Sequence, residues 1–94
     1  KISAEKAEKM GMIYSVVPSE TLMDEVKAAA TTLANMPTKA LGLTKRLLNE
    51  SMTNNLEEQL ILESKLQIES ASTEDYAEGV AAFVEKRKPN FKGN

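Results

Sequence analysis

The sequence contains no cysteine and no histidine, and only 4% of its 94 residues are aromatic. The lack of cysteine excludes disulfides and a thiolate nucleophile, and the lack of both types excludes a zinc site made of them and a histidine base. The apolar runs fall far short of the ~20 residues that span a bilayer, and the N-terminal residues lack the hydrophobic region of a signal peptide. We therefore expect a cytoplasmic protein without a membrane partner and without a bound metal.

The charges of the chain are almost balanced, with 12 basic and 14 acidic residues and a net charge of −2. No overall field would draw such a chain to nucleic acid or to an anionic membrane. A hydrophobic share of 41% and a charged share of 28% are typical of one small globular domain. Because so short a chain buries only roughly 60% of its unfolded surface, we expect a neighbouring domain or subunit to complete its core.

The first half of the chain carries two helix signals on either side of a β-favouring stretch. Ser3 is a candidate N-cap for a short helix that continues to Met10, and Gly11 stands where a left-handed residue ends a helix. Residues 13–18 (IYSVVP) favour one short strand or an extended link. Apolar residues then recur at helical spacing after Ser19, which predicts a second helix with Ser19 as its N-cap.

The second half of the chain predicts three more helices. One follows Pro37, and one runs from Leu56 to Ala71. The last begins in Ser72-Thr73-Glu74-Asp75, which resembles a capping box, and closes with Lys86, Arg87 and Lys88 before Pro89. The predicted fold class is all-α: one compact, small bundle of about four to five helices with one short extended segment.

The last predicted helix has a side lined by small residues. Gly79 and Ala82 lie on it and would let a flat ligand or another backbone approach closely, while Phe83 stands beside the flexible cation Lys86. An anionic ligand with a planar ring would fit such a surface. A plainer interpretation makes Phe83 a core residue and the small residues helix-packing positions. The basic residues would then only complement the helix dipole, at about 0.3–1 kcal/mol each.

Three segments, taken in order, resemble the crotonase superfamily of enoyl-CoA hydratases and isomerases. ISAEKAEKMGMIYSVVP is similar to the segment where the chain leaves the catalytic core of that family, and LANMPTKALGLTKRLL to the helix pair that follows. Glu74-Asp75 followed by EGVAAFVEKRKPNF resembles the C-terminal signature of the family. Together the segments cover the whole chain, and their order and spacing are specific although each is short.

The resemblance implies that residues 1–94 are the C-terminal helical domain of a longer enzyme, which forms a lid and a trimerisation surface. The oxyanion hole and the catalytic carboxylates would lie upstream, so no catalytic residue is assigned here and the isolated chain is expected to be inactive. The implied substrate is an acyl-CoA thioester, as in fatty-acid degradation, with coenzyme A as part of the substrate and no separate cofactor. The implied partners are the chain's own catalytic core and further subunits of a homotrimer or hexamer.

In the resemblance, Phe83 and Lys86 match positions that contact the adenine and the phosphates of CoA, and Lys88 and Lys92 are weaker candidates. Gln67 departs from the family pattern, because mitochondrial-type hydratases tend to have an aromatic residue there. Other residues are interpreted as structural. Packing residues are Tyr14, Tyr76 and Phe91; the five methionines fill the core; Glu57, Glu58, Glu63, Glu69, Glu74 and Glu78 are solvated or capping.

Two other classes of protein share these sequence features. A stand-alone helical interaction module would show the same apolar stripes. A non-catalytic acyl-CoA-binding bundle could use the same aromatic and lysine pair, and would bind CoA tightly as an isolated monomer. The choice between hydration and isomerisation depends on carboxylates that the resemblance places upstream.

Overall fold

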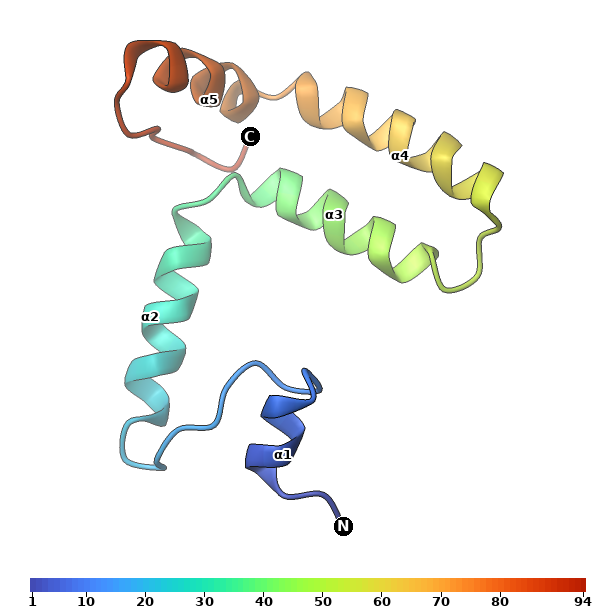
Figure 1. Cartoon of the computed structure of the whole chain (residues 1–94). Coiled ribbons are helices and arrows are strands. Elements are labelled where there is room, and N and C mark those ends of the chain that lie inside the picture. Colours follow the sequence, from blue (N-terminus) through green and yellow to red (C-terminus); the bar gives the residue numbers. More distant parts are fainter. The chain divides into compact units, whose positions relative to one another are not determined.

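A computed structural model describes residues 1–94, and its only regular secondary structure is α-helix. Its five helices, shown in Figure 1, are α1 (Ala4–Lys9), α2 (Leu22–Ala34), α3 (Thr38–Glu50), α4 (Leu56–Ala71) and α5 (Glu74–Glu85). The predicted all-α class is therefore confirmed. The expected single compact domain is not found, because the chain divides into two compact units, Lys1–Thr31 and Thr32–Asn94. None of the helices is long and apolar enough to cross a membrane.

The first unit begins with α1, whose two ends follow the predicted signals. The Ser3 hydroxyl accepts a hydrogen bond from the Lys6 N–H at 3.3 Å, as an N-cap does. At the other end Gly11 has a φ of +71°, and the N–H groups of Gly11 and Met12 donate to the carbonyls of Glu8 and Ala7. These two bonds form a Schellman motif, the usual end of a helix that stops at a left-handed glycine.

The stretch at residues 13–18 forms no strand, so of the two predicted alternatives only a link remains. A strand needs a neighbour to take up its backbone groups, and here the Val16 N–H donates to the Glu8 carboxylate instead. The next helix also begins later than predicted. Thr21 donates its N–H and its hydroxyl to the Pro18 carbonyl, so a turn occupies residues 19–21 and α2 begins at Leu22, not directly after Ser19.

In the second unit, α3 and α4 lie side by side as an antiparallel pair, and α5 contacts α4 (Figure 1). The helix starts are set locally. The Asn55 side chain accepts from the Glu58 N–H while the Glu58 carboxylate accepts from the Asn55 N–H, a complete capping box. Thr73 caps α5 through a 3.0 Å bond from the Tyr76 N–H. The predicted bounds of α4 are confirmed residue for residue.

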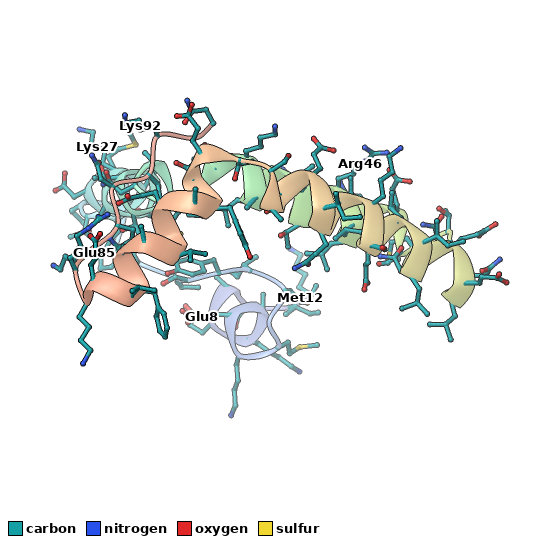
Figure 2. All side chains as sticks on the ribbon, turned by 90° about the horizontal axis from the view of Figure 1, so that it is seen from above. Glu8, Met12, Lys27, Arg46, Glu85 and Lys92 are labelled. Atoms are coloured by element: carbon teal, nitrogen blue, oxygen red, sulfur yellow. The ribbon has the colours of Figure 1, made fainter.

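The core of this structure is very small. Leu66 on α4 and Ala82 on α5 are the only buried apolar residues, each 1% exposed. Most side chains point outward from the helices in Figure 2. The prediction that methionine fills the core is wrong for this chain, since all five methionines are 40–83% exposed. So much exposed apolar surface is typical of a chain that packs against another domain or subunit.

Candidate functional site

The last helix ends three residues before the predicted end. α5 stops at Glu85, and Lys86 takes a left-handed conformation with φ 55° and ψ 38°. The Lys86 N–H donates to the Phe83 carbonyl and the Arg87 N–H to the Ala82 carbonyl, at 3.3 and 3.0 Å. This is the same Schellman motif that ends α1, with lysine in place of glycine. The basic residues therefore lie beyond the helix, in a chain that has already turned back.

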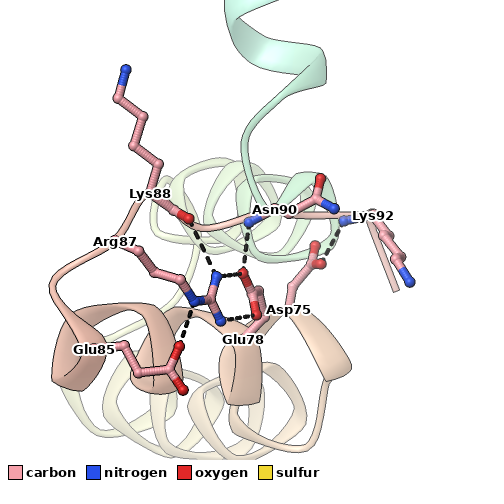
Figure 3. A network of polar contacts seen from close by, with 7 residues as sticks. All are labelled: Asp75, Glu78, Glu85, Arg87, Lys88, Asn90 and Lys92. Atoms are coloured by element: carbon pink, nitrogen blue, oxygen red, sulfur yellow. Dashed lines mark hydrogen bonds and ion pairs between the residues drawn. The ribbon is translucent and has the colours of Figure 1, made fainter.

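A carboxylate on α5 holds the returning chain (Figure 3). Glu78 accepts two hydrogen bonds from the Arg87 guanidinium, at 2.6 and 2.9 Å, and one from the Asn90 N–H at 2.7 Å. The Arg87 Nε donates to Glu85 at 2.5 Å. We call Glu78, Arg87 and Asn90 the α5 clasp. The interpretation of Glu78 as a solvated or capping residue is wrong, because its carboxylate is the centre of this network.

A second carboxylate near the start of α5 binds the end of the chain. Asp75, only 3% exposed, accepts from the Lys92 N–H at 2.7 Å and from the Gly93 N–H at 2.8 Å. Its own N–H donates to the Asn94 carbonyl at 3.0 Å. Gly93 has a φ of +82°, and a Cβ there would lie 2.5 Å from the Thr38 hydroxyl, so the end of the chain passes close to the first residue of α3.

The returning chain contacts the side of α5 that is lined by small residues. Phe91 packs on Gly79, where an added Cβ would lie 3.5 Å from the Phe91 ring. Ala82 is buried. Of the two possibilities predicted for this side, a second stretch of backbone or a flat ligand, the structure shows the first at Gly79, and the packing role predicted for Phe91 is confirmed. The packing role predicted for Tyr14 is not seen, since its side chain is 94% exposed.

Phe83 lies in the last turn of α5, and Lys86 directly follows the helix. Phe83 is 85% exposed, which rules out the core interpretation in this chain, and its carbonyl accepts from the Lys86 N–H. The Lys86 ammonium takes part in none of the three ion pairs of the chain. Phe83 also borders an open apolar groove of about 350 Å³. The groove is lined by Pro37, Ala40, Ser70, Asp75, Tyr76, Gly79, Val80, Phe83 and Phe91.

Lys88 and Lys92, the weaker candidates for a ligand contact, form hydrogen bonds through their backbone groups. Lys88 offers its carbonyl to Arg87, and Lys92 gives its N–H to Asp75, with its side chain directed away from that carboxylate in Figure 3. The chain has no cluster of three acidic residues able to hold a metal ion. An exposed aromatic ring in the last turn of α5 and a flexible cation directly after the helix are groups suited to an anionic, aromatic ligand.

Comparison with known proteins places the chain in a family. The sequence profile described as enoyl-CoA hydratase/isomerase matches residues 1–94, which is the whole chain. The chain belongs to the enoyl-CoA hydratase/isomerase family. The crotonase resemblance is therefore confirmed.

Individual relatives agree with the family profile. The chain is 46% identical to the 1,2-epoxyphenylacetyl-CoA isomerase of Escherichia coli over 99% of its own length and 36% of that protein. It is 37% identical to the mitochondrial enoyl-CoA hydratase of Pongo abelii, covering 98% of this chain and 32% of the relative. The crystal structure of an enoyl-CoA hydratase from Polaromonas sp. superposes with a TM-score of 0.89 at 30% identity, over 97% of this chain and 35% of that one. The chain thus spans about a third of the length of the relatives it matches.

The sequence alone did not reveal that the carboxylates of Asp75 and Glu78 bind the returning chain. Asp75 was assigned to the helix start and Glu78 to the solvated surface. The available signals were the opposite charges of Glu78, within the helix, and Arg87, after it, and the turn-forming residues Pro89 and Gly93 beyond them. Neither signal names the atoms that meet, because the bonds of Asp75 span 17 and 18 residues.

The α5 clasp makes stability depend on pH in acid. Hydrogen bonds from Arg87 and from the Asn90 N–H lower the pKa of Glu78 from 4.5 to about 2. A lowered pKa stabilises the fold fully above the unfolded value of 4.5, and this contribution is lost as pH falls toward 2. We expect the melting temperature of the wild type to exceed that of Glu78→Gln by a constant amount above pH 5, and the difference to shrink toward pH 2.

The same substitution at exposed Glu57, which lies outside the clasp, is the control in these thermal melts. A difference between wild type and Glu78→Gln that stays constant down to pH 2 would contradict the assigned role of the Glu78 carboxylate.

Proposed function

We propose that this chain is the C-terminal helical part of an enoyl-CoA hydratase or isomerase that acts on acyl-CoA thioesters, as in fatty-acid degradation. We further propose that Phe83 and Lys86 contact the nucleotide end of CoA. The observations that support this most directly are the exposed Phe83 ring in the last turn of α5 and, three residues later, a Lys86 ammonium that forms no ion pair within the chain. An ammonium is a compact charged donor for phosphate, and an aromatic face suits the adenine ring.

The chemistry of the thioester would belong to the catalytic core of the longer protein. The two backbone N–H groups that stabilise a thioester oxyanion, and the carboxylates that move protons, are family features that this chain does not carry. Both oxygens of the buried Asp75 already accept backbone N–H groups. For the 94 residues alone we therefore propose binding and assembly without turnover, and we propose no cofactor apart from the CoA of the substrate.

The exposed apolar surface supports a role in assembly. The side chains of Leu22 and Val26 on α2 and of Leu60 and Ile61 on α4 are 48–64% exposed. We propose that the catalytic core and the neighbouring subunits of a homotrimer or hexamer cover such positions. With only two buried apolar residues, the chain is poorly suited to the alternative roles of a stand-alone interaction module or a self-sufficient acyl-CoA-binding bundle.

Replacing Lys86 by alanine in the longer protein tests the CoA contact. A charged hydrogen bond is worth about 1.5–3 kcal/mol when partly shielded, so KM for an acyl-CoA should rise roughly tenfold or more. KM for the matching pantetheine thioester, which lacks the nucleotide, should change little. Steady-state kinetics with both substrates measures the two effects.

The control for that experiment is Lys88→Ala, which removes a neighbouring charge from the same helix end. We expect it to change KM for the acyl-CoA less than Lys86→Ala does. Equal effects of the two substitutions, or an equal effect of Lys86→Ala on both substrates, would contradict a specific contact at Lys86.

A further inference from the structure

Lys86 ends α5 in a left-handed backbone conformation, which is unusual for a residue other than glycine. The same pair of backbone bonds closes α1 with Gly11, a residue that adopts a positive φ without steric cost. Lys86 is the only residue other than glycine with a positive φ in this chain. A strained non-glycine residue persists only where the surrounding structure holds it, and such residues concentrate at functional sites.

The α5 clasp is the part of the structure that can hold this conformation. Arg87 follows Lys86 directly, and its guanidinium is bound in a two-pronged manner by Glu78. The same carboxylate binds the Asn90 N–H, so the segment between Arg87 and Asn90 is closed back onto α5 (Figure 3). Without the hydrogen bonds from Arg87 and Asn90 to Glu78, the backbone after α5 would be free to relax toward a negative φ at Lys86.

We infer that Glu78 is a positioning residue for Lys86, which acts through Arg87 and Asn90 to hold Lys86 in its left-handed conformation directly after α5. This inference rests on the proposed CoA contact. The inference assigns Glu78 no contact of its own with the ligand. Its carboxylate fixes the turn from which the lysine side chain leaves the helix, and an ammonium on a flexible stem gains affinity when its backbone is held in place.

Asp75 is a less direct candidate for the same role. Its bonds hold the chain at Lys92, Gly93 and Asn94, six or more residues beyond Lys86. Glu78 in contrast binds the residue next to Lys86. The inference therefore predicts that nucleotide binding is sensitive to Glu78 in a way that depends on Lys86 itself.

The test uses the longer protein with Glu78→Gln, which keeps the size of the side chain and removes its charge. We expect KM for an acyl-CoA to rise threefold or more, with kcat unchanged and with KM for the pantetheine thioester unchanged. In a Lys86→Ala background, Glu78→Gln should have no further effect on KM, because the group that it positions is gone. Arg87→Lys keeps the charge but loses the two-pronged contact, and should act in the same direction if Glu78→Gln folds poorly.

The outcomes separate this inference from the proposed function. If Lys86→Ala changes neither KM, the CoA contact itself is wrong and the positioning role is overturned with it. If Lys86→Ala raises KM for the acyl-CoA alone but Glu78→Gln and Arg87→Lys do not, only the positioning role is overturned. If Glu78 had a purely structural role, Glu78→Gln would raise both KM values equally, or would raise KM for the acyl-CoA as much in the Lys86→Ala background as in the wild type. Either result would also overturn the inference.

Discussion

Replacing Leu66 by alanine is expected to lower the free energy of unfolding of the 94-residue chain by about 2–5 kcal/mol. Leu66 is the one large side chain that is fully buried, and it lies on α4, the helix that contacts both α3 and α5. Its truncation removes apolar contacts and leaves a cavity in a core that has no other large member. Small domains have a total stability of only about 5–15 kcal/mol, so the variant should lose much of its cooperative transition in urea.

The control for Leu66 is Ile68→Ala on the same helix. Ile68 is 69% exposed, so the same loss of apolar atoms should cost no more than about 0.5 kcal/mol. Urea unfolding followed by circular dichroism measures both variants. Similar losses at the two positions would mean that the chain does not use the core described above, and that it gains stability by self-association through its exposed faces.

Replacing Lys86 by glycine is expected to have opposite effects on stability and on binding. Glycine relieves a left-handed conformation that costs an L-residue roughly 1–2 kcal/mol, less the extra backbone entropy that glycine has when unfolded. The net gain in stability should be up to about 1 kcal/mol. Without the ammonium, binding of an acyl-CoA by the longer protein should weaken roughly tenfold or more.

Two further substitutions separate the backbone from the side chain. Lys86→Ala removes the ammonium and keeps the strain, so it should weaken binding without the gain in stability. Gly11→Ala introduces the same strain at the end of α1, where an added Cβ meets nothing within 4 Å, and should cost about 1–2 kcal/mol. A Lys86→Gly variant that binds like the wild type would show that the lysine is not kept for its charge.

The starts of most helices could be predicted because their causes are local. Ser3, Asn55 and Thr73 each cap a helix through atoms three residues away, and Gly11 ends α1 without help from the rest of the chain. The end of α5 could not be predicted in this way. Its left-handed residue is lysine, which by itself favours continuation of the helix, and the turn is held by bonds that span nine and twelve residues.

By itself, the sequence determined the helical class, the bounds of α4 and the family. Caps, proline positions and apolar spacing act over a few residues, so they can be read without coordinates. Only the tertiary structure decided that Phe83 is exposed and that Phe91 covers Gly79. It alone showed that Glu78 and Asp75 bind the returning chain, because these contacts depend on where residues far apart along the chain meet in space.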